Sequence, residues 1–119
     1  MAMSKNINVA IIGVGSVGTN ILKKLVKYNG DGITVICVVE TNHEAPGVEY
    51  AKSRGIKVFE SSNSIIELGD KIDVVFDFTA NLEARSDFVM AMAKSRNSHT
   101  AIIPPMVAHF VWNLLEKIN

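Results

Sequence analysis

The chain has 119 residues, of which 48% are hydrophobic, with 12 basic and 12 acidic side chains and a single cysteine. This length suits one domain with its own core and is too short for two. Balanced charge gives no reason to expect a nucleic-acid or anionic-membrane partner, and one cysteine excludes an intrachain disulfide framework. Because no apolar run has membrane-spanning length and the start lacks the pattern of a signal peptide, we expect a cytoplasmic protein.

The mean hydropathy of +0.22 is high for a small, freely soluble monomer. Such a composition typically hides apolar surface in an oligomer or against a partner domain. Residues 1–3, in which Met1 and Ala2 precede a second methionine, have the form of an expression remnant and are left out of the fold prediction.

The first predicted strand runs directly into a glycine motif. Ile7–Ile12 is an almost unbroken apolar run, typical of a strand buried on both faces. It leads into Gly13-x-Gly15-x-x-Gly18, and a helical pattern over Ser16–Tyr28 follows at once. A glycine motif between a strand and a helix is typical of a dinucleotide-binding turn, whereas a glycine-rich turn without a ligand is the alternative interpretation.

Each glycine has a physical role in such a turn. Gly13 lets the chain leave the strand sharply, Gly15 leaves room for a pyrophosphate against the backbone, and Gly18 lets the helix lie close to the strand. Ser16 and Val17, at the start of the helix, offer unpaired N–H groups and the positive end of the helix dipole to phosphates.

The remaining chain alternates strands and helices. We predict strands at Ile33–Val39, Ile56–Phe59, Ile72–Phe78 and Thr100–Ile103, and helices at Gly47–Arg54, Ile65–Leu68, residues 82–95 and Val107–Ile118. Because these strands lack polar alternation, the pattern predicts an α/β fold: a Rossmann-type doubly wound parallel sheet of about five strands. We expect residues 1–119 to form this single domain, with a hydrophobic helix at its C-terminal end.

Glu40 ends the second predicted strand, about 20 residues after the glycines. A carboxylate there can accept both ribose hydroxyls of an adenosine and repel a 2′-phosphate. Thr41 follows it, and no arginine comes next, so NAD is favoured over NADP. A solvated loop glutamate, with Asn42 in the ribose place, is the alternative; S-adenosylmethionine-binding folds share this pattern too.

Thr79 and Ala80 follow the strand that ends at Phe78. Ligands lie across the carboxyl ends of the strands in an open parallel sheet, so both residues are candidates to line the cofactor path. A helix-entry turn with Asn81 as cap is a compatible alternative. We expect Asp77 to hydrogen-bond this turn.

The sequence presents no catalytic or metal-binding set. Cys37 lies inside an apolar run, where a thiol behaves as a small hydrophobe with a raised pKa. The three histidines, His43, His99 and His109, show no metal-ligand spacing, and His109 falls on the polar side of the last helix.

Two helices carry informative apolar patterns. For residues 82–95 we predict one inward face, made of Leu82, Phe88, Val89, Met92 and Ala93. The helix Val107–Ile118 is apolar around most of its circumference, whereas a helix on a sheet needs an arc of only about 100°. Part of it therefore meets a second copy or a partner, or the whole helix is tucked against the preceding helix.

Three segments carry a family resemblance. They are Val9–Thr19, with the glycine motif, Ala51–Ile56, and Ile72–Ala80, of sequence IDVVFDFTA. With a looser match at Ala101–Pro105, they resemble the N-terminal NAD-binding domain of acylating acetaldehyde dehydrogenases, which oxidise acetaldehyde to acetyl-CoA. Dihydrodipicolinate reductases and homoserine dehydrogenases begin in a similar way.

The resemblance implies a cofactor domain without its chemistry. In that family a second domain carries the catalytic cysteine, and no cysteine follows Cys37 here. Without a nucleophile there is no acyl-enzyme, so we do not expect the family reaction from this chain alone. The open hypotheses are an NAD-binding domain, a non-catalytic binding or oligomerisation module on a Rossmann scaffold, and the cofactor subunit of a split oxidoreductase.

Overall fold

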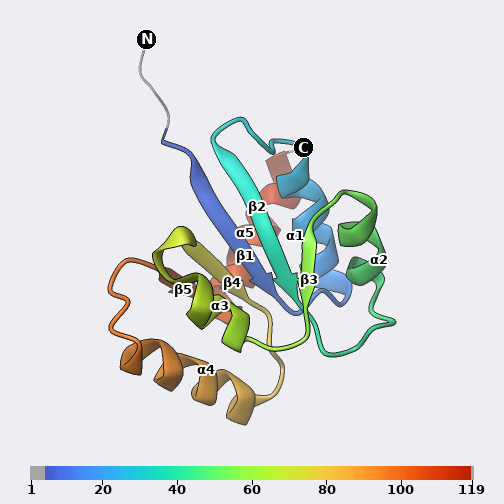
Figure 1. Ribbon diagram of the computed structural model, residues 1–119. Helices are drawn as coiled ribbons and strands as arrows, with labels where there is room; N and C mark the ends of the chain where they lie inside the picture. Colours follow the sequence, from blue (N-terminus) through green and yellow to red (C-terminus); the bar gives the residue numbers. More distant parts are fainter. Residues whose placement is uncertain (1–4, 119) are drawn as a thin grey trace.

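Five parallel strands form one sheet in the order β3-β2-β1-β4-β5 (Figure 1). The computed structural model describes residues 5–118, so the interpretation of residues 1–3 lies outside the described residues. The strands are β1 (Ile7–Ile12), β2 (Ile33–Val39), β3 (Lys57–Phe59), β4 (Val74–Asp77) and β5 (Ala101–Ile103). The predicted doubly wound parallel sheet is confirmed.

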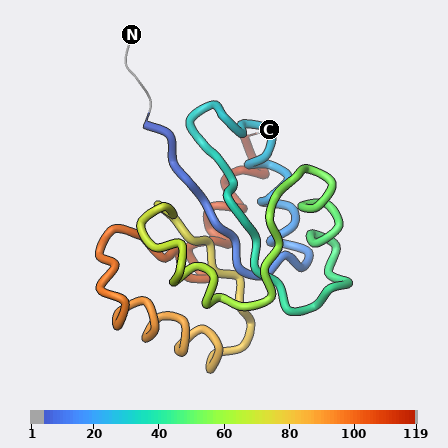
Figure 2. Tube along the Cα trace, viewed as in Figure 1, coloured from blue at the N-terminus to red at the C-terminus, as the bar shows by residue number. Residues whose placement is uncertain are grey.

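Helices cover both faces of this sheet. They are α1 (Ser16–Val26), α2 (Pro46–Ser53), α3 (Asn63–Leu68), α4 (Leu82–Lys94) and α5 (Pro105–Ile118), with a 3₁₀ turn at Gly69–Lys71. Figure 1 and the chain trace in Figure 2 show α1, α2 and α5 behind one face, and α3 and α4 against the other. Each connection from one strand to the next therefore carries a helix across a face, as parallel pairing requires.

Two apolar cores lie on the two faces of the sheet. The core under α1 and α2 contains Ile11, Leu22 and Val48, and side chains of α5 pack against its edge. The core under α3 and α4 contains Ile12, Ile65, Val75, Phe88 and Met92. Because both faces of the strands are buried, their sequences are continuous apolar runs without polar alternation.

The strand β2 contains one irregularity. Val9 pairs with Val35, but Ala10 pairs with Cys37, so Ile36 is an extra residue in the ladder. Such a bulge turns the following residues by one position. As a result Cys37 lies in the core under α3 and α4, while Val38 lies in the core under α1 and α2.

The predicted inward face of α4 is wrong in part. Phe88 and Met92 are buried, but Leu82 is 68% exposed and Val89 is 45% exposed, and Ala93 is exposed as well. Residues four apart share a helix face, which joins Phe88 to Met92 and leaves the other three away from that line. The helix therefore turns a narrow apolar stripe to the sheet.

Helix α5 begins two residues earlier than predicted, with Pro105 as its first residue. Proline suits this position because the first N–H of a helix has no intrahelical partner. Within residues 5–118, no helix is long and apolar enough to cross a membrane.

Candidate functional site

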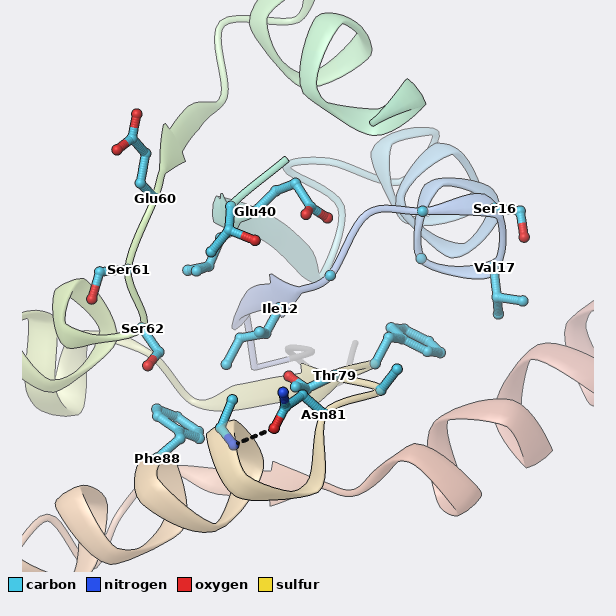
Figure 3. Close-up of a pocket in the computed structure, with 18 of the residues that line it drawn as sticks. Ile12, Ser16, Val17, Glu40, Glu60, Ser61, Ser62, Thr79, Asn81 and Phe88 are labelled. Carbon is cyan, nitrogen blue, oxygen red and sulfur yellow. Dashed lines mark hydrogen bonds between the residues drawn. The ribbon is translucent and has the colours of Figure 1, made fainter. Parts of the chain in front are cut away.

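A cleft of about 750 Å³ opens at the carboxyl ends of the strands. It lies where β1 meets β4, the point at which the strand order reverses and open α/β sheets bind their ligands. Every predicted site residue lines it: Gly13, Gly15, Ser16, Val17, Gly18, Glu40, Thr41, Thr79 and Ala80. The fold thus gathers these predicted residues from three separate segments into one cavity (Figure 3).

The glycine turn has the geometry expected of a phosphate-binding turn. Gly13 has a φ of +90°, which favours glycine, and a Cβ at Gly18 would lie 1.9 Å from the Gly13 carbonyl oxygen. A Cβ at Gly15, in contrast, would meet no atom within 4 Å. Gly13 and Gly18 are therefore needed by the fold, while the space at Gly15 belongs to the cleft.

The start of α1 faces this cleft. The Gly15 carbonyl accepts the N–H of Thr19 at 2.9 Å, so the N–H groups of Ser16, Val17 and Gly18 precede the first such bond of the helix. Backbone donors at a helix start, with the positive end of its dipole, form a ready anion site.

A second glycine contact holds the turn in place, and sequence reasoning missed it. The Thr19 hydroxyl donates to the Val14 carbonyl at 2.7 Å, and the N–H of Gly47 donates to the same oxygen at 3.1 Å. A Cβ at Gly47 would lie 2.4 Å from the Val14 Cβ, so α2 can approach the turn only with glycine there. Because this contact joins residues that are far apart in the sequence, no local sequence pattern predicts it.

Glu40 follows the last residue of β2 directly, so the prediction that placed it at the strand end is confirmed. Its Oε1 accepts the Val14 N–H at 2.8 Å and its Oε2 accepts the Asn42 N–H at 3.0 Å. The side chain is half-buried in the cleft wall, whereas Asn42 is outside the lining and bonds the N–H of Glu44. Glu40 therefore joins the second strand to the glycine turn.

The turn after β4 combines both predicted roles. Asp77 is buried, and its Oδ1 accepts the N–H of Thr79 at 2.8 Å, as the sequence predicted. Asn81 caps α4 by accepting the Ala84 N–H at 2.9 Å, drawn as a dashed line in Figure 3. Thr79, Ala80 and Asn81 all line the cleft, so a helix-entry turn and a cleft wall are the same structure.

Sequence reasoning missed two parts of the lining. Glu60, Ser61 and Ser62, after β3, form the wall on the far side of Glu40 from α1 (Figure 3). The rings of Phe78 and His109 meet edge to face, with centroids 5.6 Å apart, and both residues line the cleft. Neither part belongs to a motif; a polar Glu-Ser-Ser directly after a strand was the one signal available.

The other titratable groups lie apart from one another. Burial raises the pKa of the Cys37 thiol to about 11. His43 pairs with Glu60 at 2.9 Å, and His99 pairs with Asp73 at the opposite edge of the sheet. Over the described part of the chain, no group of three or more His, Cys, Asp or Glu side chains could hold a metal ion.

The chain is similar to a family of oxidoreductases and to curated dehydrogenases. The model of a family described as "NADP oxidoreductase coenzyme F420-dependent" matches residues 8–107. An acetaldehyde dehydrogenase of Salinispora arenicola is 28% identical over 103 residues, which is 86% of this chain and 30% of that protein. An acetaldehyde dehydrogenase of Bacillus cereus is 34% identical over 77 residues, 64% of this chain and 25% of that protein. The chain thus spans less than a third of the curated relatives it matches.

Solved structures agree on the fold. Staphylococcus aureus homoserine dehydrogenase matches 96% of this chain and 31% of its own, with a TM-score of 0.65 and 16% identity. Saccharopine dehydrogenase of Saccharomyces cerevisiae matches 83% of this chain and 21% of its own, with a TM-score of 0.56 and 21% identity. The resemblance to the cofactor domain of acetaldehyde dehydrogenases is confirmed, and the chain is a Rossmann domain of the NAD(P)-binding kind.

Proposed function

We propose that this chain, which belongs to the NADP oxidoreductase coenzyme F420-dependent family, binds NAD in the cleft at the carboxyl ends of its strands. One observation carries the proposal: nine residues chosen from the sequence as cofactor contacts line a single cleft. In this arrangement the start of α1 receives the pyrophosphate, Glu40 receives the adenosine ribose, and Thr79 and Ala80 line the path toward the nicotinamide.

The charge of the cleft supports NAD over NADP. Its acidic side chains are Glu40 and Glu60, and within residues 5–118 no lysine or arginine side chain lines it. A 2′-phosphate beside Glu40 would meet negative charge without a cation to balance it. The family description names NADP, so the family supports dinucleotide binding while the residues of this chain favour the unphosphorylated form.

Gly15→Val gives a direct test of the binding site. The added side chain meets no protein atom within 4 Å of its Cβ, so the fold should persist while the branched side chain occupies the space for the pyrophosphate. Calorimetric titration of the wild type with NAD⁺ should show binding, and the variant should show none at an unchanged melting temperature. S-adenosylmethionine and NADP⁺ are titrated alongside, and a wild type that binds neither NAD⁺ nor NADH overturns the proposal.

The chain supplies the cofactor site, and we propose that another domain or chain supplies the reaction. Its single thiol, Cys37, is buried in the core with a raised pKa and cannot serve as the nucleophile of an aldehyde oxidation. The acetaldehyde dehydrogenases that it resembles are more than three times as long as the matched region. An aldehyde substrate is therefore proposed only for an assembled enzyme.

Helix α5 is the proposed docking surface for that second part. Ala108 is buried and Trp112 is half-buried against the core, so one face of the helix belongs to the sheet. Met106, Phe110 and Leu114, spaced four residues apart, form a stripe on an exposed side and are 81%, 60% and 46% exposed. This exposed apolar stripe, together with the high hydrophobic content of the chain, favours an oligomer or a partner domain.

Phe110→Glu tests the docking surface without disturbing the core. If the chain self-associates, size-exclusion chromatography with light scattering should show an oligomer for the wild type and a monomer for the variant. Trp112→Glu is an unsuitable probe because that ring packs on the core, and its loss would unfold the domain. A wild type that stays monomeric at high concentration contradicts self-association through α5.

A further inference from the structure

The ionisable side chains of the cleft wall differ in the partners that they already have within the protein. They are Glu40, Glu60 and His109. Both Glu40 oxygens accept backbone N–H groups, and Glu60 pairs with His43. Among the cleft-lining residues, His109 is the one side chain that can carry positive charge, and it contacts the Phe78 ring.

The neighbours of His109 place its ring at the cleft. The preceding residue, Ala108, is fully buried, and its N–H donates to the Pro104 carbonyl at 2.9 Å. The imidazole stands edge-on to the Phe78 ring at an interplanar angle of 89°. This contact lies at the cleft, and His109 itself is exposed.

Phe78 connects this histidine to the glycine turn. The Phe78 backbone lies 3.3 Å from the position of a Cβ on Gly13, and its ring lies 3.6 Å from that of a Cβ on Gly18. The same ring meets the His109 imidazole edge to face, and the turn, Phe78 and His109 all line the cleft. A ligand against the glycine turn therefore shares its cavity with the imidazole.

Few charged groups lie on the elements that pack against the helix of His109. Helix α5 packs against β4 and α1. In β4 the acidic residue is Asp77, which is buried and accepts the Thr79 N–H. In α1 the basic residues of the last turn are Lys23 and Lys24. On α5 itself, Glu116 and Lys117 lie two turns further on, about 10–12 Å along the axis.

We infer that His109 is a further cofactor-binding residue, which meets the anionic pyrophosphate of the dinucleotide from α5. This inference rests on the proposed function and deepens it, because it assigns the one side-chain cation of the site. A cation at this position should strengthen dinucleotide binding, so an uncharged replacement for His109 should weaken it.

The experiment is a calorimetric titration of the wild type, His109→Gln and His43→Gln with NAD⁺. A charge-assisted contact of this kind corresponds to about tenfold in affinity. His43→Gln should bind NAD⁺ as tightly as the wild type does, whereas His109→Gln should bind it about tenfold more weakly. His43→Gln is the matched control, since His43 pairs with Glu60 in the same cleft wall.

Two further measurements separate the possible causes. His109→Lys keeps a cation at this position and should keep the wild-type affinity. ADP-ribose should repeat the behaviour of NAD⁺, and adenosine, which lacks the pyrophosphate, should bind the wild type and His109→Gln equally.

Each outcome bears on a separate claim. If the wild type binds none of these ligands, the proposed function fails. If it binds NAD⁺ but His109→Gln keeps the wild-type affinity, the role of His109 is overturned while the binding site stands. If His43→Gln loses affinity instead, the contributing histidine lies beside Glu60 and the inference is wrong.

Discussion

At the scale of single residues, Glu40 has two tasks that one carboxylate can perform together. It holds the glycine turn through the Val14 N–H, and it closes the strand end through the Asn42 N–H. Each carboxylate oxygen has lone pairs for more than one donor, so both oxygens can also accept ribose hydroxyls. The residue that shapes the turn is thus the residue that we expect to select the ribose.

Glu40→Gln should separate these tasks. The amide keeps one acceptor but loses the negative charge, so NAD⁺ affinity should fall about tenfold while NADP⁺ affinity falls less. Titration with both ligands measures the ratio of the two dissociation constants, which should narrow. Glu60→Gln, in the same cleft wall, is the control. An equal fall for both ligands would show that Glu40 acts on the turn alone.

At the scale of elements, the close approach of α1 to β1 sets the shape of the cleft. Gly18 makes this approach possible, since any side chain there would overlap the Gly13 carbonyl oxygen. Gly47 does the same for α2 against Val14. Two helices therefore meet the turn through glycines, and the third contact is the Phe78 ring.

Gly18→Ala and Gly15→Ala should differ sharply in stability. Gly18→Ala places a Cβ 1.9 Å from the Gly13 carbonyl oxygen, which belongs to the backbone and cannot move aside easily. We expect this variant to lose about 3 kcal/mol of unfolding free energy or to fold poorly. The second meets open space and should melt within about 2 °C of the wild type. Thermal melts followed by circular dichroism make the comparison, and equal melting temperatures would contradict the packing described for α1.

Sequence reasoning reached the features that depend on local pattern. Apolar runs located the strands, and the glycine spacing identified the turn, because their period and residue types are set within a few positions. Contacts between distant segments were out of reach: Gly47 against Val14, the bulge at Ile36, and His109 on Phe78. The inward face of α4 failed for a similar reason, since neighbours decide which of several apolar residues a short helix buries.

At the scale of the whole molecule, the two edges of the sheet have separate roles. The cleft lies at the carboxyl ends of the strands. At their amino ends, hydrogen bonds of Asp73, called here the Asp73 tie, join β1, the start of β4 and the loop before β5. Asp73 makes this tie: its Oδ2 accepts the Asn8 N–H at 2.7 Å, and its Oδ1 lies 2.5 Å from the His99 Nε2. Stability can therefore be altered at one edge without touching the cofactor cleft at the other.

The tie at Asp73 makes stability dependent on pH in the acid range. The hydrogen bond from the Asn8 N–H, followed by that from His99, lowers the pKa of Asp73 below its ordinary value of 3.8. A carboxyl whose pKa is lower in the folded state stabilises that state above its unfolded pKa, and this contribution disappears as the pH falls through the folded value. Asp73→Asn should therefore melt at a lower temperature than the wild type at pH 7, and the difference should vanish as the pH falls below 3.8. Melting curves from pH 7 down to acid measure the difference, with NAD⁺ binding at pH 7 expected to be unchanged. A difference that stays constant across this range would show that Asp73 contributes through packing and not through its charge.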